Sequence, residues 1–133
     1  FASDIRRDAI QMAKENYRNI RDLSHSIMWD VQSVTDLEPD ENPGMIVMNP
    51  PYGERTGEME SLKILYKGIG DMLKTNCQGY SAYLFTASSE LMKQVGLKTS
   101  RRIPLRNGNL ECRLLKYDLY AGSKKGKYMD NKS

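Results

Sequence analysis

One short segment of the sequence, Asn49–Pro50–Pro51–Tyr52, has residue types that suit chemistry on an amino group. It follows an apolar run, Met45–Met48, which predicts a buried strand that delivers the segment to an edge of the fold. A proline offers a backbone carbonyl but no N–H donor, and the asparagine side chain adds a second carbonyl. The tyrosine ring adds a flat face. Together these groups suit a planar ligand with an exocyclic amine, for which a nucleobase is the obvious candidate.

The chemistry follows from how such an amine holds its lone pair, which is delocalised into the ring. The side-chain carbonyl of Asn49 and the backbone carbonyl of Pro50 could accept its two N–H protons. That would direct the lone pair toward an electrophile and stabilise the positive charge that develops on nitrogen. Tyr52 could stack on the base. The alternative is an ordinary strand-to-loop turn. No general base has to act before the attack, so this chemistry needs no catalytic histidine.

The elements that position this segment alternate along the chain. Apolar residues recur at helical spacing in two stretches, and Asn107–Gly108 is a strong hairpin signal between two late strands. Helices that alternate with strands and end in a hairpin predict an α/β fold whose sheet is mostly parallel, with a C-terminal antiparallel hairpin. The expected helices are 8–20, 60–74 and 88–95, and the expected strands are 1–3, 24–29, 45–48, 80–86, 101–105 and 110–120.

Acidic and basic residues supply further candidate sites. Asp4 follows the first predicted strand and Asp30 follows the second. An acid in that position commonly binds a ribose hydroxyl of a nucleotide cofactor, although aspartate also favours turns. Arg101 and Arg102 lead a local basic cluster with Arg106, which is either a solvated surface or a contact for an RNA backbone.

Composition limits the other possibilities. The basic tail 122–133 carries a net charge equal to the +3 of the whole chain, so residues 1–121 are formally neutral and net charge does not argue for nucleic-acid binding. We expect 1–121 to be one domain and 122–133 a basic linker or disordered tail. No apolar run approaches the roughly 20 residues of a membrane span. Two distant cysteines and one isolated histidine, His25, predict no metal site and a reducing, cytoplasmic compartment.

Four motifs taken together resemble one enzyme family. They are Ser3–Asp4–Ile5, Ala13–Lys14–Glu15–Asn16, the extended segment Asn49–Pro50–Pro51–Tyr52–Gly53–Glu54–Arg55, and Asn107–Gly108–Asn109–Leu110–Glu111–Cys112. Many amino-methylating enzymes share the Asn-Pro-Pro-Tyr tetrapeptide. With its extension and the hairpin motif, the sequence resembles the S-adenosylmethionine-dependent RNA guanine-N2 methyltransferases that carry a THUMP domain, particularly the bacterial members that act on 23S rRNA. The resemblance runs from Phe1 to about Tyr120.

This resemblance implies a Rossmann-like methyltransferase domain that transfers methyl from S-adenosylmethionine to N2 of a guanine in RNA. By resemblance, Asp4 would bind the cofactor ribose and Asp30 would lie by its adenine. Residues 49–52 would hold the target guanine, with Asn49 also bordering the cofactor. Glu54 and Arg55 would shape the substrate side of the pocket, and Arg101 and Arg102 would contact RNA.

The sequence also departs from the family. It lacks the family's first strand and glycine-rich cofactor loop, and it lacks the THUMP domain, so we expect these to be supplied by a missing N-terminal segment of a parent chain. The first strand lies centrally in the family's sheet. Without it, another segment fills the gap, the two flanking strands pair directly, or the chain is only partly ordered. We expect weak or no activity from this chain alone.

Three other functions remain open at the level of sequence. The same tetrapeptide serves tRNA-directed guanine-N2 methyltransferases and adenine-N6 methyltransferases. A non-catalytic RNA-binding module that keeps the fold is the third alternative.

Overall fold

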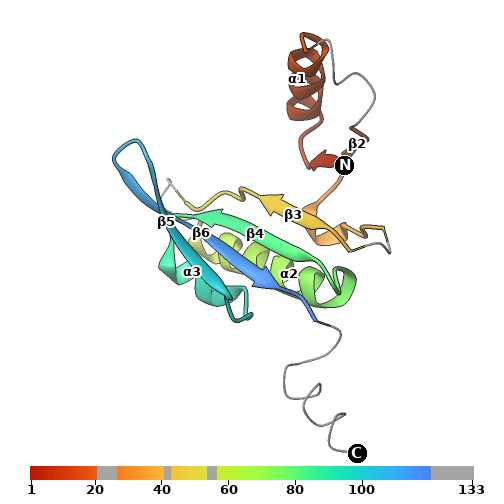
Figure 1. Ribbon diagram of the computed structural model, residues 1–133. Helices are drawn as coiled ribbons and strands as arrows, with labels where there is room; N and C mark the ends of the chain where they lie inside the picture. Colours follow the sequence, from red (N-terminus) through yellow and green to blue (C-terminus); the bar gives the residue numbers. More distant parts are fainter. Residues whose placement is uncertain (21–26, 41–42, 54–56, 121–133) are drawn as a thin grey trace, which may run out of the picture. The chain divides into compact units, whose positions relative to one another are not determined.

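The computed structural model describes residues 1–20, 27–40, 43–53 and 57–120. The chain divides into two compact units, Phe1–Leu37 and Glu38–Ser133, each with its own internal packing (Figure 1). The predicted tail 122–133 lies outside the described residues. None of the helices in the described ranges is long and apolar enough to cross a membrane.

The first unit is a small parallel βαβ arrangement. Strand β1 (Ala2–Asp4) leads into helix α1 (Arg7–Arg18), and the chain returns as strand β2 (Trp29–Val31), followed by a short 3-10 helix, η1 (Val34–Asp36). Tyr17 of α1 packs edge-on against Trp29, with ring centroids 5.8 Å apart. This contact and the buried Ile10 hold α1 against the two strands.

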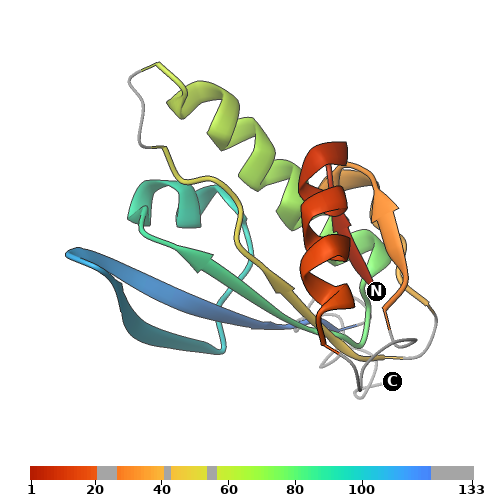
Figure 2. The same ribbon diagram turned by 90° about the horizontal axis from the view of Figure 1, so that it is seen from above.

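The second unit is a four-stranded sheet in the order β3-β4-β6-β5. Strand β3 (Met45–Met48) runs parallel to β4 (Ser81–Thr86), and β6 (Leu110–Asp118) runs antiparallel to both β4 and β5 (Arg101–Asn107). Figure 2 shows β5 and β6 as one long hairpin. These strands, with β1 and β2, confirm the predicted α/β fold in which parallel strands are followed by a C-terminal antiparallel hairpin.

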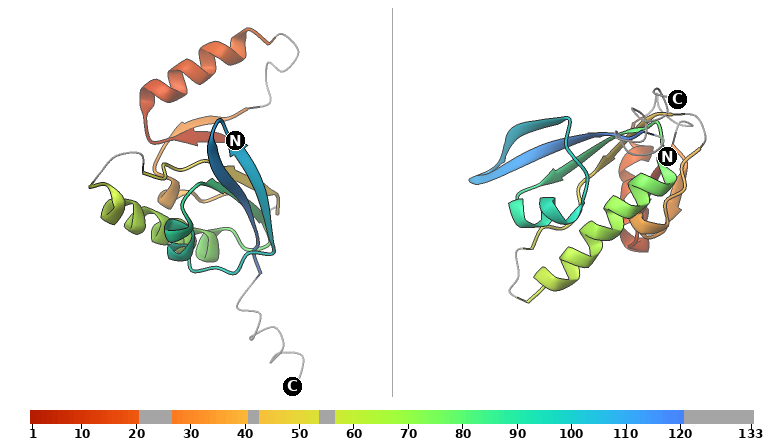
Figure 3. Two further views of the ribbon diagram at one scale, coloured as in Figure 1. Left: turned by 90° about the vertical axis from the view of Figure 1, so that its left-hand side faces the viewer. Right: turned by 90° about the horizontal axis from the view of Figure 1, so that it is seen from below.

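Helices α2 (Met59–Asn76) and α3 (Ser89–Gln94) cover one face of this sheet, as the two views of Figure 3 show. The buried positions of α2 recur at three- and four-residue steps and face Leu84 and Leu115 of the sheet. Each such apolar side chain contributes roughly 1.5–3 kcal/mol when fully buried. Ser88 caps α3, since its Oγ accepts a hydrogen bond from the Leu91 N–H at 3.1 Å. The buried residues of α2 are Leu62, Tyr66, Ile69, Gly70, Met72 and Leu73.

Two sequence predictions about the strands were wrong in detail. The second strand was expected at 24–29, but it runs from Trp29 to Val31, because its ladder with β1 extends from Met28 O to Gln32 N. Residues 24–26 lie outside the described ranges. Asp30 is therefore inside the strand and not after it. Strand β3 was expected to be buried, yet Met45 and Val47 are 66% and 70% exposed, because β3 is an edge strand whose second face carries no helix of its own unit.

The strands β1 and β3 belong to separate sheets in the described part of the chain. The ladder partner of β1 is β2, and that of β3 is β4, so among the described residues both β1 and β3 keep one free edge.

The α2–α3 contact gives a test of the packing. A Cβ built on Gly70 would lie 1.8 Å from the backbone carbonyl oxygen of Val95, which follows α3. Gly70→Ala should therefore destabilise the fold by about 2 kcal/mol in urea unfolding, although alanine is intrinsically better in a helix by about 1 kcal/mol. Asp71→Ala, an exposed change in the same helix, is the control. Equal or greater stability of Gly70→Ala would contradict the close approach.

Buried acidic groups make the stability depend on alkaline pH. Burial raises the pKa of the Cys77 thiol from 9.0 to about 11, and burial raises the pKa of Tyr117 from 10.0 to about 12. The fold favours the protonated forms, so their contribution is complete below pH 9 and is lost as pH rises through 9–11 and then 10–12. The free energy of unfolding should fall across this window, and Cys77→Ala should flatten its first part. A wild-type stability that stays constant to pH 11 would refute this.

Candidate active site

The tetrapeptide Asn49–Pro50–Pro51–Tyr52 leaves β3 at the carboxyl edge of the parallel pair. Met48 lies opposite Leu84, so the segment emerges beside the last residues of β4. Pro50 is buried and anchors it, whereas the Asn49 side chain is exposed. Within the described part of the chain, no hydrogen bond joins the Asn49 side chain to another residue. The amide of Asn49 is thus free to bind a ligand at this edge.

Gly53 turns the chain after the tetrapeptide toward α2. Its φ is +83°, a conformation that residues with a Cβ rarely adopt, and a Cβ there would lie 3.1 Å from Leu62 Cδ1. The glycine that extends the motif therefore has a structural role. The other two residues of that extension, Glu54 and Arg55, lie outside the described residues, and their assignment to the substrate pocket stays a prediction.

A buried hydroxyl pair joins α2 to the end of β4. Tyr66 Oη lies 3.2 Å from Thr86 Oγ1, and Thr86 Oγ1 accepts a hydrogen bond from the Ser88 N–H at 3.2 Å. Burial raises the pKa of Tyr66, its hydrogen bond to Thr86 opposes the shift, and the phenol of Tyr52 adds a smaller rise. The hydroxyl pair therefore fixes the end of β4, beside which the tetrapeptide leaves β3.

The first unit holds the two predicted cofactor carboxylates. Asp4 is the last residue of β1 and accepts a hydrogen bond from the Arg6 N–H at 2.7 Å, which leaves its other oxygen available. Asp30 lies in β2 opposite Ser3, and its Oδ1 accepts from the Val31 N–H at 2.8 Å. Both are exposed near the carboxyl edge of this pair of strands, and because they occupy successive ladder positions they belong to opposite faces.

The predicted RNA contacts, Arg101 and Arg102, lie at the start of β5, away from the edge that carries the tetrapeptide. In the strand ladder Arg101 lies opposite Lys116, and Lys116 lies opposite Tyr83 in the middle of β4. Arg102 donates a hydrogen bond through Nε to Thr99 Oγ1 at 3.1 Å. Their contact with RNA stays a prediction, and the register does not bring them to the tetrapeptide.

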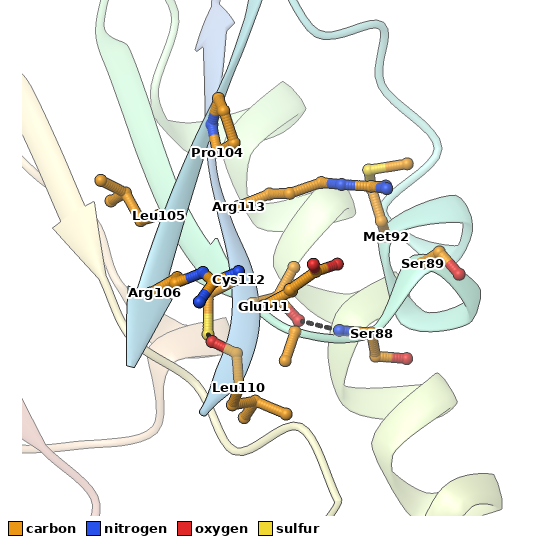
Figure 4. Close-up of a pocket in the computed structure, with 12 residues that line it drawn as sticks. Ser88, Ser89, Met92, Pro104, Leu105, Arg106, Leu110, Glu111, Cys112 and Arg113 are labelled. Atoms are coloured by element: carbon orange, nitrogen blue, oxygen red, sulfur yellow. Dashed lines mark hydrogen bonds between the residues drawn. The ribbon is translucent and has the colours of Figure 1, made fainter. Parts of the chain in front are cut away.

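A cavity of about 740 Å³ opens at the carboxyl edge of β4, between α3 and the β5–β6 hairpin. In Figure 4, Arg113 and Glu111 both extend from β6 toward α3, and Arg106 lies on the neighbouring strand. Arg106 was predicted only as part of a basic cluster and Glu111 only as part of the hairpin motif, and Arg113 was not predicted at all. The lining residues are Thr86, Ala87, Ser88, Ser89, Met92, Pro104, Leu105, Arg106, Leu110, Glu111, Cys112 and Arg113.

The hairpin register carried a signal for these residues. The turn sets Asn107 opposite Leu110, which pairs Arg106 with Glu111 and Pro104 with Arg113. Alternate residues on a strand share a face, so the two arginines lie on the same side of the hairpin. The turn itself places Gly108, at φ +63°, first and Asn109 second, as in a type II′ turn, and not the expected Asn-Gly pair.

The two units carry different groups. The second unit carries the exposed amide of Asn49 and the half-buried ring of Tyr52, and the first carries the exposed carboxylates of Asp4 and Asp30.

Comparison with known proteins agrees with these observations. The model of the family described as "RMKL-like, methyltransferase domain" matches residues 1–116. A Synechocystis sp. protein whose name includes the words RNA methyltransferase is 42% identical over 120 residues, which is 90% of this chain and 31% of that protein. The ribosomal RNA large subunit methyltransferase K/L of Syntrophotalea carbinolica is 41% identical over 117 residues, which is 85% of this chain and 16% of the relative.

A solved structure has the same fold. The chain SMU.472, in complex with SAH, superposes with a TM-score of 0.79 at 23% identity and covers 91% of this chain and 31% of its own length. The present chain therefore spans about a third or less of the length of these three proteins. The family match confirms the resemblance that the motifs predicted.

The buried hydroxyl pair Tyr66–Thr86 gives a test of how α2 is held against the end of β4. Thr86→Val keeps the shape of the side chain but leaves the Tyr66 hydroxyl without its hydrogen-bond partner and the Ser88 N–H without its acceptor. We expect a loss of about 2–3 kcal/mol in urea unfolding. Tyr66→Phe, which leaves the Ser88 hydrogen bond in place, should cost about 1 kcal/mol. A Thr86→Val protein as stable as the wild type would show that neither bond contributes.

Proposed function

We propose that this chain, which belongs to the family of RMKL-like methyltransferase domains, transfers a methyl group from S-adenosylmethionine to N2 of a guanine in RNA as part of a longer protein. The RNA of the large ribosomal subunit is the proposed substrate. Support for the RNA comes from the large-subunit rRNA methyltransferase K/L at 41% identity, and support for the cofactor comes from SMU.472, which binds SAH.

The observation that carries the proposal is the exposed Asn49 amide at the carboxyl edge of β3, beside the buried Pro50. An N2 amine has two N–H donors, and the Asn49 side chain and the Pro50 backbone each have a carbonyl oxygen that could accept one of them. Because Pro50 has no N–H of its own, it adds no competing donor at the point where the amine binds. This pairing favours an exocyclic amine over a ring nitrogen, which offers at most one proton.

Each residue has a defined task in the reaction. Asn49 and Pro50 accept the two N2 protons, orient the lone pair, and stabilise the positive charge that grows on nitrogen as the new C–N bond forms and the C–S bond breaks. Tyr52, which is half-buried, supports the base by stacking. After transfer, the amine releases one proton. Since the lone pair attacks directly, no group of this site has to remove a proton first.

The cofactor's groups fit the residues that the first unit presents. One oxygen of Asp4 is free after its bond to the Arg6 N–H, and a free carboxylate oxygen suits a ribose hydroxyl. Asp30 would face the adenine end. When bound, S-adenosylmethionine supplies an activated methyl group. S-adenosylmethionine also needs a glycine-rich loop whose backbone groups contact it. These 133 residues contain no such loop after a strand, so we assign the loop to another segment of the longer protein.

The test uses the full-length protein, large-subunit rRNA and S-adenosylmethionine labelled in its methyl group. Asn49→Ala should lower kcat about 100- to 1,000-fold, the usual effect of removing one group that stabilises charge in the transition state, while RNA affinity stays within about two-fold. Asn49→Asp, which keeps an acceptor oxygen, should retain more activity than Asn49→Ala.

Asn19→Ala is the matched control, since it makes the same change at the exposed C-cap of α1. An Asn49→Ala protein that keeps wild-type kcat would contradict the proposed role. Loss of RNA affinity with unchanged kcat would instead assign Asn49 to RNA binding, whereas a wild-type protein that binds the RNA and transfers no methyl group would point to a non-catalytic RNA-binding module.

A further inference from the structure

We propose that the cavity between α3 and the β5–β6 hairpin binds the nucleotide next to the target guanine, with its phosphate held between Arg106 and Arg113. This inference rests on the proposed function, since it assigns a second part of the same RNA. The cavity volume of about 740 Å³ lies within the range of pockets that enclose small ligands, and it accommodates a whole nucleotide.

The strand register places this cavity on the correct edge of the sheet. Arg113 pairs with Thr86, the last residue of β4, and Arg106 pairs with Glu111, two residues further out on β6. Strand β4 runs parallel to β3, so this end of β4 is the same edge at which the tetrapeptide emerges. A strand of RNA whose guanine is held by the tetrapeptide would continue along this edge toward the cavity.

The two arginines of the cavity form no ion pair among the described residues, and with Glu111 the three side chains carry a net charge of about +1. In the described ranges of the chain, neither Arg106 nor Arg113 has an ion pair or a side-chain hydrogen bond, although Glu111 lies opposite Arg106 in the ladder. Both arginines are exposed, and Figure 4 shows the Arg113 side chain reaching across the opening toward Met92. A guanidinium binds two phosphate oxygens at once, and such contacts supply most protein–RNA backbone affinity.

The rest of the lining suits a nucleotide better than a free anion. Met92, Pro104 and Leu110 present apolar surface against which a splayed base can pack. Glu111 repels an anion but accepts a hydrogen bond from a ribose hydroxyl or a base N–H, which inorganic phosphate does not offer. The carboxylates predicted to hold the cofactor, Asp4 and Asp30, are not among the lining residues.

The test is RNA binding by the full-length protein without the cofactor, measured by fluorescence anisotropy over a series of KCl concentrations. The probe is a short single-stranded RNA with one guanosine in a run of uridines. The double variant Arg106→Gln/Arg113→Gln should bind about ten-fold more weakly and lose about 0.7 from the slope of log Kd against log salt, as expected for one lost phosphate contact. Lys67→Gln, an exposed change on α2, is the control for removing a charge.

A chemical change in the RNA separates this contact from a general electrostatic effect. In two further probes, an uncharged methylphosphonate replaces the phosphate on one side or the other of the guanosine. We expect one of these probes to bind the wild type about ten-fold more weakly than the unmodified RNA and to bind the double variant with unchanged affinity. Inorganic phosphate at equal concentration to the RNA should not compete. Equal losses in wild type and double variant, or a double variant no weaker than Lys67→Gln, would overturn the assignment.

The outcome is distinguishable from failure of the proposed function. Mass spectrometry of nucleosides from a parallel methylation reaction reports the methylated atom independently of binding. If the wild type and the double variant bind the probes as predicted but the wild type produces no N2-methylguanosine, only the proposed function is overturned. A wild-type protein that does not bind the probe but produces N2-methylguanosine in rRNA would overturn the cavity assignment alone.

Discussion

The parallel pairing of β3 with β4 is the interaction on which the rest of the site depends. It places the end of β3 beside the end of β4, so the tetrapeptide, the Tyr66–Thr86 hydroxyl pair and the cavity all gather at one edge of the sheet. Since β4 also pairs with β6, the same ladder fixes where Arg113 lies. A slip of one residue between β3 and β4 would turn Asn49 and Pro50 each to the other face of the sheet. The Asn49 amide would then be separated from the rest of the site.

The two sheets of the described residues carry the groups proposed for two different ligands. The groups proposed to hold the base belong to the second unit, and the carboxylates proposed to hold the cofactor belong to the first. Each unit has an edge strand, β1 or β3, with an unpaired row of backbone groups in the described part of the chain.

Much of the fold and part of the site could be predicted from the sequence. The apolar spacing of residues 60–74 predicts α2, because the periodicity of a buried helix face is contained within the helix's own sequence. The tetrapeptide could be recognised for a related reason, since its residue types carry their chemistry in a contiguous segment. Strand β2 was misplaced because three residues become a strand only by pairing with β1, and local sequence does not encode that pairing. Arg113 was missed because its position depends on the β5–β6 register, which joins residues distant from the tetrapeptide.

The most direct test of the central claim is to identify the methylated nucleoside. The full-length protein would be incubated with large-subunit rRNA and S-adenosylmethionine carrying a deuterated methyl group, and the digested RNA would be analysed by mass spectrometry against authentic standards. Acceptors arranged for a guanine amine predict that the label appears in N2-methylguanosine. Label in N6-methyladenosine, or in a base methylated at a ring nitrogen or carbon, would contradict the assignment of Asn49 and Pro50 to the N2 amine of guanine.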